Sequence, residues 1–228
     1  MLYAIGDLHL SLGTAKPMDV FGGAWVGYMD KLQQGIEVIK PEDTTVLLGD
    51  VSWALDLQEA ARDFAWIDQI PGRKIILKGN HDYWWNTATK FSNFCKENGF
   101  SDIHLLNNNH FEYDGWAICG TRGWFFEEER SAEHDEKVFR RELLRLETSL
   151  KSAGDLPKMV FLHYPPRYKG YTCEPLLEIL HKYDVRRCYY GHLHGASHSL
   201  AMEGLWEGIE YKLVSADRLL FLPHPVIF

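Results

Sequence analysis

Short runs of aliphatic residues alternate with stretches in which apolar residues recur every three or four positions. Residues 1–5, 44–48 and 74–77 form continuous apolar or β-branched runs, which predict buried strands. Between these runs, apolar residues at helical spacing predict one helix that ends at Pro41 and a second that ends just before the third strand. This βαβαβ order predicts parallel strands joined by right-handed crossovers.

The pattern changes after a third predicted helix, which closes near Gly99. Three short strands follow, and Asp114-Gly115 between the last two is typical of a hairpin turn, so we expect a second, antiparallel portion to begin here. The remaining expected elements are a charged helix within 127–151, strands at 158–162 and 186–190, a short helix around 176–180, and strands after 208 that turn at Ala216-Asp217. No repeat or linker interrupts the chain, and we assign residues 1–228 to a single domain.

Composition and charge exclude several classes of protein. Hydrophobic residues make up 46% of the 228 residues, but no apolar run approaches the roughly 20 residues that span a bilayer, so we expect no membrane segment. The net charge of −8 argues against a broad basic surface for nucleic acid. The four cysteines form no C-x-x-C pair, and the first residues read as a strand rather than a signal peptide. We therefore predict a cytoplasmic protein with free thiols.

Polar side chains gather where the predicted strands end. The segment Gly79-Asn80-His81-Asp82 directly follows the strand at 74–77, and the glycine allows the chain to turn sharply there. Each such residue taken singly could be an ordinary turn residue. Ligand-type residues also follow four other strands, however, and these are Asp7, His9, Asp50, His163, His192 and His194. The set as a whole predicts a site.

The chemistry of this set favours two metal ions. Asp7 and His9 point the same way in an extended segment and can reach one ion together, while the lone carboxylate of Asp50 can bridge two. Adding the amide oxygen of Asn80 gives seven nitrogen or oxygen ligands. Such ligands suit Mn²⁺, which is our first choice, or Fe, Zn²⁺ or Ni²⁺, and disfavour Ca²⁺. Two divalent ions with two carboxylates and a hydroxide leave a net positive centre that attracts phosphate.

Two such ions, roughly 3.5–4 Å apart, activate a shared water and clamp a phosphoryl group for in-line attack. The expected reaction is hydrolysis of a phosphoester by a metal-bridging hydroxide, without a phosphoenzyme. The leaving alkoxide then needs a proton from a nearby acid. We assign this role to His81, with Asp82 orienting its ring and raising its basicity.

The five blocks together resemble those of the calcineurin-like metallophosphoesterase superfamily. In chain order they are Asp7-x-His9, Gly49-Asp50, Gly79-Asn80-His81-Asp82, His163 and Gly191-His192-x-His194. The resemblance implies a four-layer α/β/β/α sandwich of two mixed sheets with a dinuclear centre at the strand ends. It also implies that Asp7, His9, Asp50 and His194 hold one ion, that Asp50, Asn80, His163 and His192 hold the other, and that His81 is the acid.

Differences between this sequence and two better-known branches of the superfamily narrow the expected class of enzyme. Protein Ser/Thr phosphatases carry an acidic residue and an arginine shortly after the bridging aspartate, where this chain has Val51-Ser52-Trp53-Ala54, and an arginine where it has Lys78. Purple acid phosphatases place a tyrosine ligand where Trp53 stands, and lack the counterpart of His9. The sequence is most similar to the small bacterial and archaeal predicted phosphohydrolases, whose substrates vary.

Four residues near the motifs are candidates for substrate binding. Trp53 and Trp84 could stack a base or an aryl group, although core packing explains Trp84 equally well. Arg122 and Arg167, on loops after strands, could hold a phosphate or a terminal anionic group.

We therefore predict a metal-dependent phosphoesterase acting on a small phosphorylated molecule. Aromatic surroundings and the absence of an arginine beside Asp50 favour a diester over a monoester. Two alternatives remain open at this point. A nuclease would need a basic groove, and a non-catalytic scaffold would use the same fold as an interaction surface.

Overall fold

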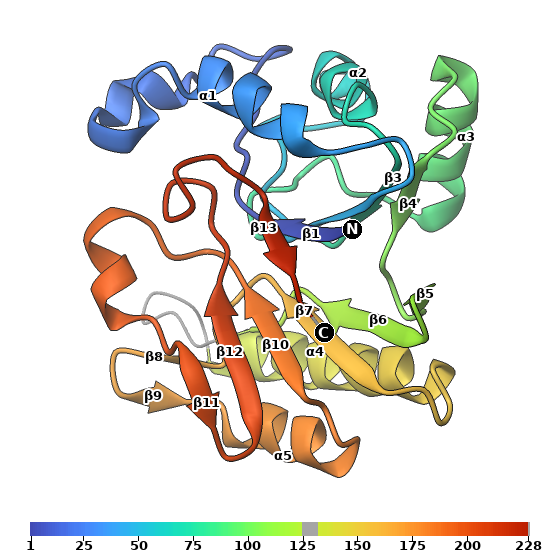
Figure 1. The fold of residues 1–228 in the computed structure, drawn as a ribbon, viewed down its shortest axis with the longest axis vertical. Coiled ribbons are helices and arrows are strands. Elements are labelled where there is room, and N and C mark those ends of the chain that lie inside the picture. The colour runs from blue at the N-terminus through green and yellow to red at the C-terminus, as the bar shows by residue number, and fades with distance from the viewer. Residues whose placement is uncertain (125–131, 228) are drawn as a thin grey trace.

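Two β-sheets lie face to face, with helices on both outer faces (Figure 1). The computed structural model describes residues 1–124 and 132–227. The first sheet has the strand order β13-β1-β2-β3-β4. Its strands are β1 (Leu2–Ile5), β2 (Thr44–Leu47), β3 (Arg73–Ile76), β4 (Ile103–Leu105) and β13 (His224–Val226). Strands β1 to β4 pair in parallel, as the βαβαβ pattern predicts, and β13 pairs antiparallel with β1.

The second sheet has the order β11-β12-β10-β7-β6-β5. Its strands are β5 (Phe111–Tyr113), β6 (Trp116–Thr121), β7 (Lys158–Leu162), β10 (Arg187–Tyr190), β11 (Gly204–Trp206) and β12 (Ile209–Leu213). The predicted hairpin at Asp114-Gly115 is confirmed, and both turn residues have positive φ. The expected antiparallel character is wrong for the centre of this sheet, where β6, β7, β10 and β12 are parallel. Long crossovers return the chain to the same end of the sheet between β6 and β7 and between β7 and β10, which a hairpin cannot do.

Helices cover each sheet on one side only. The first sheet carries α1 (Tyr28–Gly35), α2 (Ala61–Asp68) and α3 (Ala88–Asn98), and the second carries α4 (Ala132–Ser152) and α5 (Glu174–Lys182) (Figure 1). The short segments are η1 (Met18–Phe21), η2 (Gly23–Trp25), η3 (Ile36–Val38), η4 (Gly195–Leu200), β8 (Arg167–Tyr168) and β9 (Tyr171–Thr172). Part of the predicted helix at 127–151 lies outside the described residues.

Strand alternation divides the apolar side chains among three cores. In β2 and just after it, Val46 and Leu48 face the second sheet, whereas Leu47 faces α1 and α2. On the far side, Leu146 of α4 and Leu180 of α5 pack on the second sheet. The fold is therefore the four-layer α/β/β/α sandwich, as expected. Both faces of each central strand are buried, which explains why these strands appear in the sequence as continuous apolar runs.

Two further sequence predictions concern the thiols and the membrane. All four cysteines are buried and none forms a disulfide. Within 1–124 and 132–227, none of the helices combines the length and apolarity that a bilayer crossing requires.

Candidate metal centre

The loops at the carboxyl ends of β1, β2, β3, β7 and β10 carry the predicted ligands. These strands belong to both sheets, so the loops meet where the two sheets face each other. The structure brings together seven of the predicted side chains, which are Asp7, His9, Asp50, Asn80, His163, His192 and His194.

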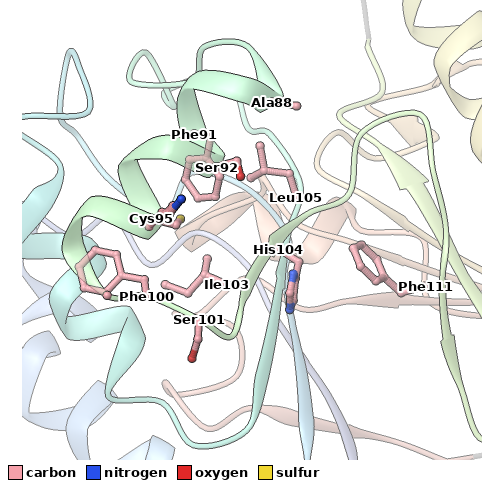
Figure 2. Close-up of a pocket in the computed structure, with 12 residues that line it drawn as sticks. Ala88, Phe91, Ser92, Cys95, Phe100, Ser101, Ile103, His104, Leu105 and Phe111 are labelled. Atoms are coloured by element: carbon pink, nitrogen blue, oxygen red, sulfur yellow. The ribbon is translucent and has the colours of Figure 1, made fainter.

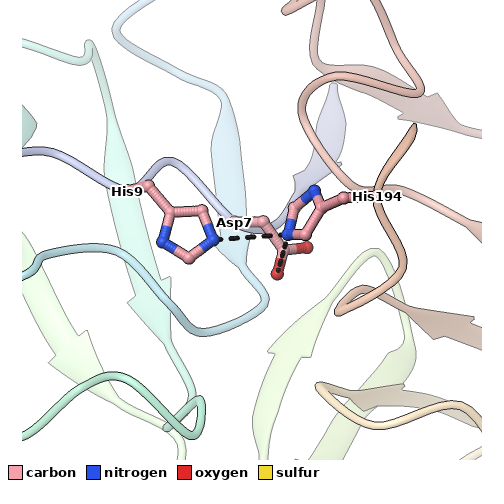
Figure 3. A group of neighbouring side chains, drawn as sticks. All are labelled: Asp7, His9 and His194. Carbon is pink, nitrogen blue, oxygen red and sulfur yellow. Dashed lines mark hydrogen bonds and ion pairs between the residues drawn. The ribbon is translucent and has the colours of Figure 1, made fainter. Parts of the chain in front are cut away.

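One group of donors consists of Asp7, His9 and His194 (Figure 3). The Nε2 atoms of the two histidines lie 3.3 Å apart, and His194 Nε2 lies 3.6 Å from Asp7 Oδ1. The three donor atoms come within 4.8 Å of one another, which is the spacing of ligands around a shared ion. The side chains of Asp7 and His9 are almost completely buried.

A second group consists of Asp50, His163 and His192, with Asn80 against it. His163 Nε2 is 2.6 Å from Asn80 Oδ1 and 3.5 Å from Asp50 Oδ2, and His192 Nδ1 is 3.0 Å from the same amide oxygen. On its other side, the His163 ring donates from Nδ1 to the Leu48 carbonyl at 2.9 Å. Because Nδ1 carries the proton of this bond, the lone pair of Nε2 is the one that can bind a metal ion.

Asp50 lies between the two groups. Its Oδ2 is 3.9 Å from His9 Nε2 and 3.5 Å from His163 Nε2, so one carboxylate faces a histidine of each group. Its Oδ1 accepts a hydrogen bond from the His81 backbone N–H at 2.7 Å, which fixes the orientation of the carboxylate. This is the arrangement that a bridging ligand needs.

The backbone around the ligands is strained. Asp7, His9, Asp50 and His192 all have φ between 47° and 72°, a region that non-glycine residues rarely occupy. Glycines make the close approaches possible, because a Cβ on Gly79 would lie 2.1 Å from Asp50 Oδ1. Backbone strain concentrated at one set of polar residues is typical of a functional site.

An ion pair links Asp7 to His194. Burial raises the pKa of Asp7, but the hydrogen bond and charge of His194 outweigh burial and hold this pKa below its ordinary range. Burial also opposes protonation of His194, yet hydrogen bonds to Asp217 and Asp7 raise its pKa to about 10. A metal ion bound at His194 would have to displace that proton.

In the second group the pKa shifts have the opposite signs, so that the neutral forms are favoured. Burial and the nearby Asp82 charge raise the pKa of Asp50 well above its ordinary value. Burial and the neighbouring His163 lower the pKa of His192 to about 3. Without a cation, this group therefore holds its histidines neutral and disfavours a charged Asp50.

These residues fit a pair of divalent cations. Neutral imidazole nitrogens and carboxylate oxygens converge in a buried pocket, where a cation would compensate the charge that burial disfavours. The buried Nδ1 of His9 has no hydrogen-bond partner among the described residues. Backbone groups orient Asp7, Asp50 and His163, as partners of metal-ligating side chains usually do.

Asp217, which follows β12 and orients His194, was not among the predicted site residues. Its Oδ1 accepts from His194 Nδ1 at 2.9 Å, and its Oδ2 accepts from the Gly195 N–H at 3.0 Å. His198 Nε2 lies 3.2 Å from the same carboxylate. A carboxylate on the far nitrogen of a ligating histidine fixes the ring and raises its basicity. The sequence does show an aspartate after the strand that became β12. We interpreted Ala216-Asp217 only as a turn.

The predicted role of Asp82 needs correction. Its carboxylate accepts hydrogen bonds from the backbone N–H groups of Asp50 at 2.8 Å, Val51 at 2.9 Å and Gly79 at 2.7 Å, and from Trp84 Nε1 at 2.9 Å. Among the described residues, no hydrogen bond joins it to the His81 ring. Asp82 therefore ties together the loops after β2 and β3 instead of orienting His81.

The two candidate tryptophans have different surroundings. Trp84 is buried and packs edge-on against Phe64 at 4.8 Å, so its predicted contact with substrate is wrong and it belongs to the core. Trp53 is partly exposed, stacks on His9 at 4.9 Å and lies 4.5 Å from the His81 ring. Only Trp53 of this pair faces the candidate metal centre.

The two candidate arginines have different positions relative to the donor groups. Arg122 follows β6, with its Nη2 3.5 Å from Glu142 and its guanidinium 4.8 Å from the Trp124 ring. The backbone carbonyl of Arg122 accepts from His163 N, which places the residue near that ligand. Arg167 lies on β8, where its guanidinium is 5.7 Å from the centroid of the Trp206 ring.

The His81 ring lies beside the first donor group. Its centroid is 5.9 Å from that of His9 and 6.3 Å from that of Tyr83. Burial and the nearby His163 lower the pKa of His81 to about 4.

A large hollow elsewhere contains none of these residues. It has a volume of about 630 Å³ and lies between α3 and the β4 edge of the first sheet (Figure 2). Its lining includes Phe91, Cys95 and His104, without a converging set of ligands. Volume alone therefore does not identify the functional site in this chain.

The fold and the donor groups together define a metal-dependent hydrolase of the α/β/β/α sandwich class. Residues 2–196 match the model of the calcineurin-like phosphoesterase family. The chain belongs to this family, which makes it a metal-dependent phosphoesterase. No curated protein matches the chain significantly.

Solved structures share the fold at low sequence identity. The phosphopantetheinyl hydrolase PptH from Mycobacterium tuberculosis is 15% identical, with a TM-score of 0.56 over 94% of this chain and 88% of that one. The protein of unknown function AQ665 from Aquifex aeolicus is 19% identical, with a TM-score of 0.51 over 98% and 94% of the two chains. TT1561 of Thermus thermophilus is 14% identical, with a TM-score of 0.54 over 85% and 81%.

Proposed function

We propose that this protein hydrolyses a small phosphodiester at a dinuclear metal centre. The observation that carries the proposal is the position of Asp50, whose Oδ2 lies within 4 Å of a histidine in each donor group. A carboxylate shared between two sets of ligands is the protein's contribution to a two-ion site. When bound, two divalent ions would lower the pKa of a shared water and stabilise charge on the phosphoryl oxygens.

Each donor group would hold one of these ions. Asp7, His9 and His194 would bind the first, and His163, His192 and Asn80 the second, with Asp50 contributing to both. All of these ligands are nitrogen or oxygen atoms, which suits Mn²⁺ as well as Fe, Zn²⁺ or Ni²⁺. Asp217 would hold the His194 ring in the ligating orientation.

The surroundings of the site favour a diester. A monoester dianion calls for cationic side chains that contact its free oxygens. Lys16 is a cation beside the site, with its Nζ 5.5 Å from the centroid of the Trp53 ring, whereas the guanidinium of Arg122 pairs with Glu142 and Arg167 lies on β8 against Trp206. Trp53 instead presents an apolar face beside the first donor group, where an esterified group can lie.

His81 is the proposed general acid. Its backbone N–H is bonded to the bridging carboxylate, so its ring is anchored next to the centre at which phosphorus would bind. The ring also lies against Trp53, on the side where the esterified groups of a substrate would be. From this position the protonated ring can give its proton to a departing alkoxide, and because the pKa of His81 is lowered to about 4 this form is a small fraction at neutral pH.

Metal dependence is the direct test of the proposed function. We expect chelator-stripped protein to be inactive and Mn²⁺ to restore hydrolysis of bis-p-nitrophenyl phosphate more strongly than that of p-nitrophenyl phosphate. Metal analysis should find about two ions per chain. Faster hydrolysis of the monoester would show that the protein is a phosphomonoesterase of the same family. Absence of turnover with Mn²⁺, Fe²⁺, Zn²⁺ or Ni²⁺ in folded protein would instead favour the scaffold alternative.

Replacing His81 should reveal the acid through the leaving group. With His81→Asn we expect kcat for a diester with an alkoxide leaving group to fall roughly 10²-fold, and much less for a p-nitrophenyl ester, whose leaving group needs little protonation. Tyr83→Phe, two residues further along the same loop, is the matched control. Equal losses for both kinds of ester would contradict an acid role and leave His81 a positioning residue.

A further inference from the structure

An apolar hollow opens directly from the first donor group. Its volume is about 450 Å³, and its lining includes the ligand candidates His9 and His194 together with Trp25, Trp53, Met18 and Phe21. Pockets that bind small molecules have volumes of roughly 300–1,000 Å³. A group attached to a phosphoryl centre at these histidines can therefore enter this hollow.

Two indole rings frame the histidines. Trp53 stacks on His9 with 4.9 Å between ring centroids, and Trp25 meets His194 edge-on at 5.5 Å. The indole N–H of Trp53 is directed to the Met18 sulfur at 3.4 Å, so it is not offered to a ligand. The Lys16 ammonium lies 5.5 Å from the centroid of the Trp53 ring, and the remaining ring surface of Trp53 and Trp25 next to the candidate metal centre is apolar.

The segment that contributes Phe21 to the hollow carries further exposed apolar side chains. Val20 and Phe21 are 76% and 70% exposed, and Val26 is 57% exposed. Phe21 lines the hollow, as does the small side chain of Ala24. Of these exposed side chains, Phe21 adds apolar surface to the hollow itself.

The polar side chains in the lining are already engaged. Apart from the two histidines, the only charged side chain in the lining, as far as the chain is described, is Asp217, which bonds to His194 and the Gly195 N–H. A sugar or a nucleobase would bury hydroxyl or N–H groups here without partners, which is costly. An alkyl or aryl group loses nothing on entry and gains burial.

We propose that this hollow binds an apolar ester group, an alkyl chain or an aryl ring, of a phosphodiester substrate. This inference rests on the proposed function and names the substrate class of that same site. Trp25, Trp53 and Phe21 form the apolar walls, while the phosphoryl group lies at the donor residues. The enzyme selects among phosphodiesters by the size and apolarity of the group that does not leave.

Two diesters with the same leaving group test this selection. Ethyl and octyl p-nitrophenyl phosphate differ only in the length of the group that would enter the hollow. Each buried methylene is worth roughly fourfold in affinity. Because part of the chain stays exposed, we expect the octyl ester to have a kcat/KM roughly 50-fold higher, mainly through KM.

Filling the hollow should abolish the preference. In Ala24→Trp we expect kcat/KM for the octyl ester to fall about tenfold or more while that for the ethyl ester stays about the same. Ala88→Trp is the matched control, since Ala88 is also exposed but lines the remote hollow beside α3 (Figure 2). Equal use of both esters by the unmodified protein, or equal losses in Ala24→Trp, would overturn the inference and leave the phosphodiesterase function standing.

A binding measurement separates this inference from the proposed function. If neither ester is hydrolysed, the proposed function fails, and calorimetric titration with octylphosphonate and ethylphosphonate still tests the hollow. Tighter binding of octylphosphonate to the metal-loaded protein, lost in Ala24→Trp but not in Ala88→Trp, supports the apolar pocket. Equal affinities for the two phosphonates overturn it.

Discussion

Asp50→Asn is expected to bind about one metal ion instead of two and to lose roughly 10³-fold in kcat. The substitution keeps the shape of the side chain and an oxygen that can still accept from His81 N, so the loop should stay in place. What it removes is the negative charge between the donor groups. Stabilisation by the metal pair is worth several kcal/mol in the transition state, and each 1.4 kcal/mol is about tenfold in rate.

Asp56→Asn is the matched control for this prediction. Asp56 is exposed, and its side chain accepts from the N–H groups of Gln58 and Glu59. Metal analysis and steady-state kinetics on both variants give the comparison. Full metal content together with unchanged turnover in Asp50→Asn would refute a bridging role and with it the dinuclear mechanism.

The second large effect is on stability. Asp82→Ala is expected to lower the free energy of unfolding by on the order of 3–5 kcal/mol, because several buried N–H groups lose their acceptor together. These groups belong to the loops after β2 and β3 and to the indole of Trp84. Water cannot replace the carboxylate, since its side chain is fully buried.

Urea unfolding of the metal-free protein measures this loss. Asp56→Ala removes an acceptor of backbone N–H groups at an exposed site, where water replaces it, and should cost about 1 kcal/mol or less. If Asp82→Ala does not fold, Asp82→Asn keeps one acceptor oxygen and should show an intermediate loss. An Asp82→Ala midpoint equal to that of Asp56→Ala would contradict the structural role.

The sequence was sufficient to place the candidate ligands because their signal is local. Continuous apolar runs marked strands buried on both faces, and the residue after each run had to lie at the edge of a sheet. Asp7, Asp50 and His163 could be found in this way. The short strands β8, β9 and β11 could not, since two or three residues carry no periodicity.

The direction in which each side chain points could not be predicted from the sequence. Asp82 and Trp84 stand next to the predicted acid, yet both turn inward, where each is the hydrogen-bond partner of the other. Neighbours in sequence need not share surroundings after a sharp turn, and the positive φ values at this centre show how strongly the backbone bends. Asp217 was missed for the opposite reason, because its partner His194 is distant in the sequence and no local pattern links them.

The pairing of β1 with β13 has a consequence for how the protein is made. The strand that leads to Asp7 and His9 is synthesised long before its antiparallel neighbour, which spans residues 224–226. At translation rates of about 5–20 residues per second, roughly 10–40 seconds separate the two. During this interval one edge of β1 has no partner strand, and near its end His194 is made before the carboxylate of Asp217 that orients it. We therefore expect tight metal binding only after the segment that carries Asp217 has been synthesised.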